Sequence, residues 1–408
     1  MQFFSRKYIF SYLYKLLCKK QIAASYSLSW EQRKAKELFV STADKGYPEL
    51  PVLSATQDRG MIRRDENSIN IFHDKKNEAG YKRVLPGQFV IHLRSFQGGF
   101  AHSTIEGITS PAYTVFGFSE PEKHDSEYWK YVFTSKSFIR RLETVTYGIR
   151  DGRSISYEEF LTLGFVYPSK AEQKAIARYL DKLSDLITLH QRKYDKLTNV
   201  KKSMLEKMFP KNGSNVPEIR FKGFTEAWEQ RKLGDVVKEI TRNDPESEAP
   251  IMMITANNGF IEQSERYAFN NAGESLKKYI LLKKGELAYN HGASKLRPYG
   301  SCFALTTAEN ARIPFVYHCF SAENQNAEFM SIELNGAEIE NQLRKIVSSG
   351  ARMDGLLNIS FDEYTSVSVL LPGTEEQDCI ADFFRQLDNL ITLHQRKWKR
   401  INFAVHTD

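Results

Sequence analysis

Leu186-Ile-Thr-Leu-His-Gln-Arg-Lys193 returns without change as Leu390-Ile-Thr-Leu-His-Gln-Arg-Lys397, 204 residues further along the chain. Around both copies, apolar residues recur at alternating steps of four and three, which is typical of the inner seam of a coiled coil. The seam positions are Ile176, Leu180, Leu183, Ile187, His190, Tyr194 and Leu197, and then Ile380, Phe384, Leu387, Ile391, His394, Trp398 and Ile401. Continued through Met204 and Met208, the first seam predicts a helix roughly 50 Å long. We therefore expect two related long helices that pair with each other.

A histidine interrupts each apolar seam, at His190 and at His394. One interpretation is a polar device that fixes the register of the two helices. The other is a histidine whose ring carbons pack while its nitrogens contact water. We expect no metal at this pair, because neither a carboxylate nor a cysteine stands beside either histidine on the seam.

The repetition extends beyond the two helices. Trp30-Glu-Gln-Arg-Lys34 recurs as Trp228-Glu-Gln-Arg-Lys232, and the offset between matching residues drifts from 198 to 204 along the chain. Other matching pairs are Gly60 with Gly259, Gly87 with Gly285, Arg150 with Arg352, and Pro168 with Pro372. A slow drift of this kind indicates a duplicated unit that has acquired short loop insertions.

Each repeat is predicted to be a mixed α/β (α+β) domain of about 140 residues followed by a long helix. Short strands are expected at 50–53, 88–93 and 111–118, a helix at 127–142 and a closing strand at 160–167, with counterparts in the second repeat that include a helix at 327–346 and a closing strand at 364–371. Capping boxes are expected at Ser169 to Glu172 and at Thr374 to Gln377. The predicted segments are 1–29, an atypical N-terminal segment; 30–168, the first domain; 169–209, the central helix; 210–227, a linker; 228–372, the second domain; 373–401, a short distal helix; and 402–408, a tail.

The composition is that of an ordinary globular chain with a modest basic excess. Of 408 residues, 41% are hydrophobic, and the net charge of +7 is compatible with a polyanionic partner or simply with solvated faces. The four cysteines lack the paired spacing of a zinc site or a disulfide framework, which favours a cytoplasmic location. Residues 1–29 superficially resemble a signal peptide, but Lys15 interrupts the apolar run, so we interpret them as an amphipathic helix or arm.

These features together resemble the specificity subunit of type I restriction-modification enzymes. The resemblance covers about residues 30 to 401 and includes Val216-Pro-Glu-Ile-Arg-Phe-Lys-Gly-Phe224 and Trp228-Glu-Gln-Arg-Lys-Leu-Gly234. It implies two target recognition domains, each of which reads one half of a bipartite sequence in double-stranded DNA. It also implies an antiparallel coiled coil that sets the separation of the two halves. Two methyltransferase (modification) subunits would dock on that coiled coil, and restriction subunits would add to them.

Two consequences follow for the DNA target and for assembly. Readers arranged with quasi-twofold symmetry favour half-sites about one turn of DNA apart, roughly 34 Å, and two different domains favour an asymmetric target. The chain departs from the family pattern where a Phe- and Tyr-rich segment precedes Trp30, and where the distal seam ends at Ile401 after about 33 Å. A truncated or recombined, inactive specificity subunit is therefore a further alternative.

The residues expected to contact DNA lie on loops that contain polar side chains, cations and glycines. In the first domain they are Thr56, Gln57, Arg59, Arg94, Ser95, Gln97, Arg150 and Arg153; in the second they are Asn257, Asn258, Asn290, His291, Ser294, Lys295, Arg297 and Arg352. Arginine, lysine, amide and hydroxyl groups supply the hydrogen bonds that proteins make to base edges and phosphates. Arg150 and Arg352 are the strongest candidates, because both repeats keep them, although an arginine could equally brace its own loop.

No catalytic motif is present in the sequence. We find no glycine-rich cofactor loop, P-loop or nucleophile elbow, and no Asn/Asp-Pro-Pro-aromatic motif of an amino-methylating enzyme. The resemblance implies that S-adenosylmethionine, ATP and Mg bind to partner subunits and that this chain binds no cofactor. The alternative function is a coiled-coil scaffold whose two α/β domains bind proteins or sugars.

Overall fold

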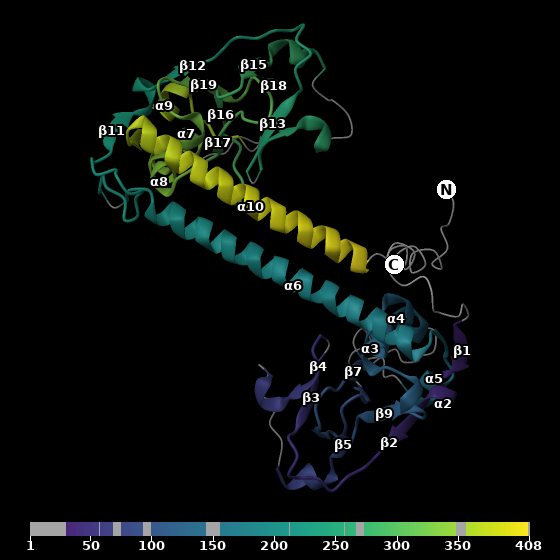
Figure 1. The fold of residues 1–408 in the computed structure, drawn as a ribbon. Helices are drawn as coiled ribbons and strands as arrows, with labels where there is room; N and C mark the ends of the chain where they lie inside the picture. Colours follow the sequence, from purple (N-terminus) through teal and green to yellow (C-terminus); the bar gives the residue numbers. More distant parts are fainter. Residues whose placement is uncertain are drawn as a thin grey trace. The chain divides into compact units, whose positions relative to one another are not determined.

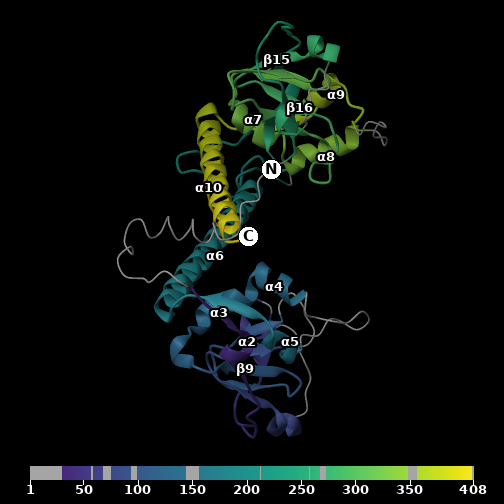
Figure 2. The ribbon, with the colours of Figure 1, turned by 90° about the vertical axis from the view of Figure 1, so that its right-hand side faces the viewer.

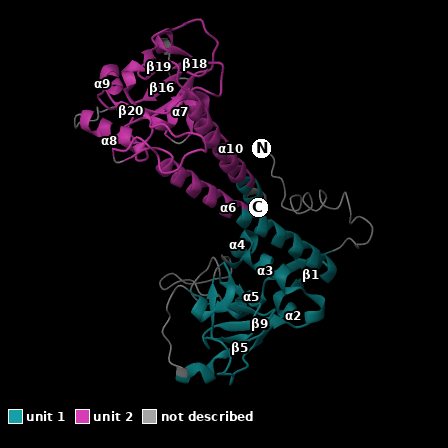
Figure 3. Ribbon diagram, turned by 60° about the vertical axis from the view of Figure 1, so that its left-hand side comes forward, with its two compact units in different colours: residues 1–189, 398–408 teal, residues 190–397 magenta. Residues whose placement is uncertain are grey.

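The structure is a computed structural model that describes residues 30–406, except 57, 68–74, 93–98, 144–155, 212, 257, 267–272 and 348–355; at 75, 143, 273–274 and 403–406 it describes the backbone alone. The chain forms two compact units (Figure 3). Unit 1 comprises residues 1–189 and 398–408, and unit 2 comprises residues 190–397.

Unit 1 is built around a four-stranded antiparallel sheet in the order β2-β9-β6-β7. Its strands are β2 (Phe39–Thr42), β6 (Phe89–Ile91), β7 (Phe100–His102) and β9 (Thr114–Phe118). Three two-stranded ladders complete the unit: β1 (Glu31–Lys34) with β10 (Gly164–Tyr167), β3 (Leu53–Thr56) with β4 (Gly60–Arg63), and β5 (Lys82–Val84) with β8 (Gly107–Thr109). The helices are α2 (Ala35–Leu38), α3 (Ser126–Thr134), α4 (Lys136–Glu143) and α5 (Tyr157–Leu161), with 3-10 turns η1 (Arg64–Glu66), η2 (Lys75–Gly80) and η3 (Pro121–Lys123).

Unit 2 repeats this strand order and strand pairing. Its sheet runs β12-β19-β16-β17, from β12 (Val237–Glu239), β16 (Leu287–Asn290), β17 (Ser301–Ala304) and β19 (His318–Ala322). The ladders are β11 (Glu229–Lys232) with β20 (Ser368–Leu371), β13 (Met252–Thr255) with β14 (Gly259–Glu262), and β15 (Ile280–Lys283) with β18 (Asn310–Ile313). The helices are α7 (Ala327–Glu333), α8 (Ala337–Ile346) and α9 (Phe361–Thr365), with 3-10 turns η4 (Leu233–Asp235), η5 (Gln263–Glu265) and η6 (Gly273–Lys278). Helix α7 lies beside the sheet in both views (Figures 1 and 2).

Equivalent buried glutamines tie each domain to the long helix that follows it. In unit 1, Gln173 Oε1 accepts the Asp125 N–H at 2.9 Å and its Nε2 donates to the Pro168 carbonyl at 2.8 Å. In unit 2, Gln377 makes the same two contacts, to Asn326 N–H at 2.9 Å and to the Pro372 carbonyl at 2.9 Å. Both glutamines are fully buried, so each long helix starts at a defined position against its own domain.

The two long helices are α6 (Lys170–Lys207, 38 residues) and α10 (Thr374–His406, 33 residues). Within unit 2, the C-terminal half of α6 packs antiparallel to α10. His190 contacts His394, Lys201 contacts Asp388, and Met208, at the end of α6, shares a core with Ile380. The prediction that the distal helix ends at Ile401 is wrong. The helix continues to His406 because no glycine or proline stands between 402 and 406, so helix propensity carries it past the apolar seam.

Other element boundaries differ from the sequence prediction. The single helices expected at 127–142 and 327–346 are each broken in two, at Ser135 and at 334–336. The expected closing strands begin as short helices, α5 and α9, and become strands only at Gly164 and Ser368. The repeated Glu-Gln-Arg-Lys motif, which carried no secondary-structure prediction, is the strand that pairs with each closing strand.

The start of α10 differs from the capping box predicted at Thr374 to Gln377. The Gly373 carbonyl accepts the Glu376 and Gln377 N–H groups, and the Gln377 side chain bonds to Asn326 and Pro372. Glycine 373 is the counterpart of Ser169, so the two predicted boxes are out of register by one residue.

The domain cores are rich in aromatic rings. In unit 1, Phe39 packs edge-on against Phe116 at 5.5 Å and Trp129 at 5.2 Å between ring centroids. In unit 2, Tyr289 stacks on Tyr364 at 3.9 Å, and both side chains are buried. Rings of this size bury large apolar areas and favour specific edge-on or stacked geometry. The sheets and their loops are thereby held in place. Among the described helices, none combines the length and the apolar character that crossing a bilayer requires.

Candidate nucleic-acid interface

The β3–β4 and β13–β14 hairpins end in equivalent threonine-closed turns. Thr56 Oγ1 donates to the Gly60 carbonyl at 2.8 Å and accepts the Arg59 N–H at 3.1 Å. Thr255 Oγ1 makes the same contacts, to the Gly259 carbonyl at 3.3 Å and from the Asn258 N–H at 3.2 Å. Thr56 therefore positions the turn, and the exposed side chains of Arg59 and Asn258 lie at the tips.

Both turns need glycine at their last position. Gly60 has φ of 69° and Gly259 has φ of 63°, a region that favours glycine because other residues carry a Cβ that clashes there. The matched glycines in the sequence therefore mark two turns of the same shape.

In unit 2, the Asn290 side chain and Gly292 connect the β16–β17 loop to Ile254 of β13 and to Leu356. Asn290 Nδ2 donates to the Ile254 carbonyl at 3.1 Å, next to the β13–β14 turn, and its Oδ1 accepts the Gly292 N–H at 2.9 Å. Gly292 pairs with Leu356, which directly follows the segment that contains Arg352. The Asn290 side chain is half-buried, and its amide nitrogen and oxygen are both hydrogen-bonded, so it positions the loops rather than contacting a base.

His291 is buried beside Asn290 and is held entirely by the backbone. Its Nδ1 lies 2.7 Å from the Leu357 carbonyl oxygen, and its Nε2 lies 2.7 Å from the Val316 carbonyl oxygen. Each ring nitrogen faces a carbonyl oxygen, to which a ring N–H can donate, and the ring joins the β16–β17 loop to two other segments. We reassign His291 from DNA contact to loop positioning.

The β16–β17 loop is closed by Ser294 and Arg297. Ser294 N–H donates to the Arg297 carbonyl at 3.0 Å, and Ser294 Oγ accepts the Arg297 N–H at 3.0 Å. The Arg297 guanidinium is half-buried, donates to the Asn335 carbonyl at 2.7 Å, and has its pKa lowered by burial. Arg297 thus braces its own loop, the alternative that the sequence left open for arginines.

Lys295 and Leu296 are the exposed large side chains at this loop, beside exposed Ala293, Ser294 and Pro298. Leu296 is 59% exposed, the largest value among the exposed large apolar side chains of the described residues. A single leucine between two cations has no helical or strand period, so the sequence does not predict this exposed side chain. Eight predicted contact residues lie outside the described residues: Gln57, Arg94, Ser95, Gln97, Arg150, Arg153, Asn257 and Arg352.

The helix pair of unit 2 is joined at its seam by two histidines. His190 Nδ1 lies 2.9 Å from His394 Nδ1, with ring centroids 5.1 Å apart. One nitrogen must donate and the other accept, so this contact requires at least one neutral ring. Burial, and then the charges of Lys397 and Lys193, lower the pKa of His190; burial, and then His190 and the same lysines, lower that of His394.

The seam residues are buried or half-buried all along the two helices, from Ile176 to Leu197 and from Ile380 to Trp398. The repeated motif also places two leucines on the outer face of each helix. In α6, Leu186 and Leu189 are 42% and 45% exposed; in α10, Leu390 and Leu393 are 45% and 44% exposed. An exposed pair of leucines one helical turn apart, present twice, is typical of a protein contact surface.

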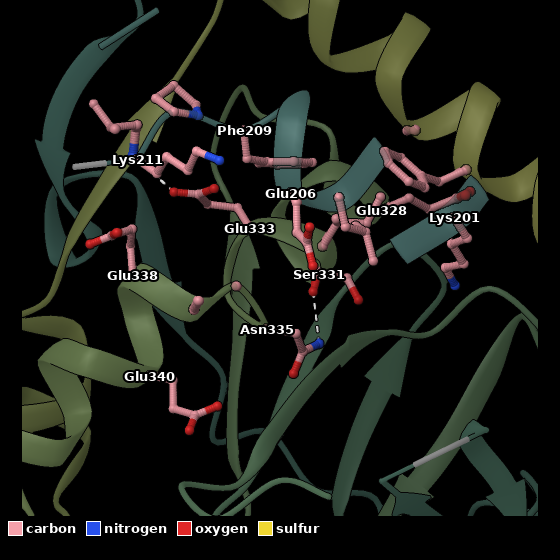
Figure 4. Close-up of a pocket in the computed structure, with 18 of the residues that line it drawn as sticks. Lys201, Glu206, Phe209, Lys211, Glu328, Ser331, Glu333, Asn335, Glu338 and Glu340 are labelled. Atoms are coloured by element: carbon pink, nitrogen blue, oxygen red, sulfur yellow. Dashed lines mark hydrogen bonds between the residues drawn. The ribbon is translucent and has the colours of Figure 1, made fainter. Parts of the chain in front are cut away.

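Unit 2 also contains a cavity of about 1370 Å³ between α6, α7, α8 and β20 (Figure 4). Its charged lining is mixed, with Lys201 and Lys211 among several glutamates that include Glu206, Glu328 and Glu338. This mixture disfavours a phosphate backbone as the occupant, although Leu296 and Arg297 of the β16–β17 loop also line the cavity. On its wall, Glu333 is buried and accepts the Leu370 N–H at 3.1 Å, and burial raises its pKa to about 7.

Comparison with known proteins finds relatives only among solved structures. No family model matches the chain, and neither does any curated protein. The S subunit of a type I restriction-modification system from M. genitalium is similar, with 13% identity, a TM-score of 0.48 and coverage of 96% of this chain and 99% of that one. The HsdS subunit from Thermoanaerobacter tengcongensis is similar at 14% identity and a TM-score of 0.43, with coverage of 96% and 100%. A chain from a structure of type I R-M complex assembly and conformational transition is similar at 13% identity and a TM-score of 0.42. The match covers 94% of this chain and 99% of that one. What this chain does is therefore inferred from its own residues.

Proposed function

We propose that this chain is the DNA-recognition subunit of a type I restriction-modification complex. The observation that carries the proposal is the duplication of one α/β domain and its helix, with the same strand order and pairing and with polar loops at equivalent positions. Two related DNA-binding domains joined by long helices fit a target with two separated half-sites. Because the loop sequences of the two domains differ, the half-sites differ and the target is asymmetric.

The exposed loop residues have the chemistry that DNA recognition needs. Arg59 and Lys295 supply cations for phosphates, and Asn258 supplies an amide that can pair with an adenine edge. Thr56, Asn290, His291, Ser294 and Arg297 hold these loops in shape, which supports contact geometry set before binding.

The helices serve as a spacer and a docking surface in this proposal. Two methyltransferase subunits would cover the outward leucine pairs of the repeated motif, and restriction subunits would join the complex through them. Methyl transfer and strand cleavage would then belong to the partners, with S-adenosylmethionine, ATP and Mg bound there, in the cytoplasm. This chain would contribute recognition and no catalysis.

The test is coexpression of the full chain with a type I methyltransferase subunit, followed by mapping of methylated adenines in the host genome. The expected result is methylation at one asymmetric bipartite motif. A purified complex that methylates no such motif would refute the proposal and favour a protein- or sugar-binding scaffold. The matched control is the methyltransferase subunit expressed alone.

A further inference from the structure

A buried ion pair in unit 2 holds the segment that precedes the second domain. Arg220 Nε and Nη2 each donate to a Glu376 carboxylate oxygen at 2.7 Å, and only 12% of the Arg220 side chain and 2% of the Glu376 side chain are exposed. A two-point contact between a guanidinium and a carboxylate is the strongest common form of charged hydrogen bonding. The Phe221 ring follows, 6.0 Å from the Phe383 ring. The backbone of this segment is anchored by the Ile219 N–H, which donates to the Lys207 carbonyl at 2.9 Å.

Unit 1 repeats the receiving half of this arrangement. Glu172, Gln173 and Tyr179 occupy the positions that Glu376, Gln377 and Phe383 occupy in unit 2, and Glu172 is 7% exposed. Among the described residues, no arginine or lysine is paired with Glu172, and the indole of Trp30 is its hydrogen-bond partner. Burial raises the pKa of Glu172, as expected for a carboxyl group taken from water without a cation.

Trp30 is also less covered than its counterpart in unit 2. It is 39% exposed, whereas Trp228 is 2% exposed and packs against Phe209 and Phe329. The Trp228 N–H also donates to the Asn215 carbonyl at 2.8 Å, so residues just before Ile219 contact this tryptophan in unit 2.

The sequence shows that the missing group is not supplied at the matching position. Arg220 and Phe221 precede Trp228 by eight and seven residues, and at the same spacing before Trp30 stand Ile22 and Ala23. Neither side chain carries a guanidinium or an aromatic ring. The second copy of the chain is also an unsuitable donor, because its own Arg220 is already bound to Glu376.

We propose that Glu172, Trp30 and Tyr179 form a dock for an Ile-Arg-aromatic segment of a different polypeptide, which takes the place that Ile219-Arg220-Phe221 fills in unit 2. The guanidinium binds the Glu172 carboxylate through two hydrogen bonds, the aromatic ring packs on Tyr179, and the segment covers Trp30. A buried carboxylate without a cation is costly, so the dock gains most from an arginine. This inference does not depend on DNA recognition and is tested without DNA.

The probe is a fluorescein-labelled peptide with the sequence of residues 215–224, Asn-Val-Pro-Glu-Ile-Arg-Phe-Lys-Gly-Phe, titrated with the full chain and followed by fluorescence anisotropy. We expect saturable binding that weakens at least about tenfold when the peptide arginine is replaced by lysine, or when the chain carries Glu172→Gln, because each change removes a two-point charged contact. Glu158→Gln, which changes an exposed carboxylate of the same unit, should leave the affinity within about twofold. Circular dichroism melts establish that each variant is folded.

A second measurement locates the peptide. Iodide quenching of tryptophan fluorescence should fall when the peptide binds, and the fall should disappear in Trp30→Phe. The proposal is overturned if the peptide does not bind, or if Glu172→Gln binds it as well as the unchanged chain does. It is also overturned if Glu376→Gln alone abolishes binding, since the peptide would then be exchanging into unit 2.

Discussion

Lys295 and Arg297 lie two residues apart on one loop, yet their surroundings assign them different roles. Lys295 is exposed at the tip, whereas the Arg297 guanidinium is half-buried and donates to the Asn335 carbonyl. A cationic side chain can contact DNA only if it is not already held by hydrogen bonds within its own protein. Neighbouring positive charges are therefore not interchangeable.

We expect Lys295→Ala to weaken binding to specific and random DNA equally and to reduce the slope of log affinity against log salt by about one. Arg297→Ala should instead lower the melting temperature, because it leaves the Asn335 carbonyl without its donor. Titrations at several salt concentrations and thermal melts of the two variants check this pair. A sequence-selective loss in Lys295→Ala would identify a base contact instead.

Glu333 makes unit 2 less stable as the pH rises. Burial raises its pKa to about 7 from an unfolded value of 4.5, so the folded state holds a proton that the unfolded state loses first. The stabilisation is complete below pH 4.5 and is lost as the pH rises through about 7. The whole effect is on the order of 3 kcal/mol.

Glu333→Gln should remove this dependence, because the amide oxygen can still accept the Leu370 N–H without carrying a charge. We expect the variant to match the unchanged chain near pH 5 and to exceed it in stability near pH 8. Urea unfolding at both pH values measures the difference. If the free energy of unfolding changes equally between the two pH values in both proteins, the pKa of Glu333 is not raised.

At the level of elements, the antiparallel helix pair of unit 2 depends on pH in the opposite direction. The pKa values of His190 and His394 are lowered, so their contact stabilises the pair above the unfolded value of 6.5 and is lost as the pH falls through the lowered values. Two protonated rings with Nδ1 atoms 2.9 Å apart would repel each other.

The double substitution His190→Leu and His394→Leu should abolish this acid sensitivity. In the Glu333→Gln background, where the opposing titration is absent, we expect the melting temperature of the chain with both histidines to fall from pH 7.5 to pH 5. That of the chain with both leucines should stay constant, because leucine packs on the seam without charge. A variant that still loses stability in acid would place the sensitive group elsewhere.

Leu390 and Leu393, on the outer face of α10, are almost half exposed and therefore contribute little to packing within unit 2. Leu390→Ser with Leu393→Ser should therefore leave the melting temperature nearly unchanged and reduce copurification of the methyltransferase subunit at least about tenfold. The control is Leu387→Ser, which changes a buried seam residue and should unfold the pair instead. Undiminished copurification with the double variant would move the docking surface away from this face.

For the whole molecule, the duplication could be recognised from short identical motifs long before any contact was known. The helix pairing was also predictable, because apolar residues spaced four and three apart form a stripe that is buried by packing against a second helix. The helix predicted at 327–346 missed the break between α7 and α8 at 334–336, although Asn335-Gly336 is a turn signal. The break is explained by Asn335, whose side chain donates to the Cys302 carbonyl and accepts the Cys302 N–H across the sheet.

The sequence by itself determined that the chain contains two copies of one unit and that a helix follows each, because these properties are written in local periodicity and identity. Which loop residues are free to meet a ligand was decided only by the tertiary structure. Asn290, His291 and Arg297 have the chemistry of DNA contacts, but backbone carbonyls from distant segments occupy their polar atoms. Hydrogen-bonding capacity is fixed by residue type, whereas its availability depends on which groups the fold brings within about 3 Å.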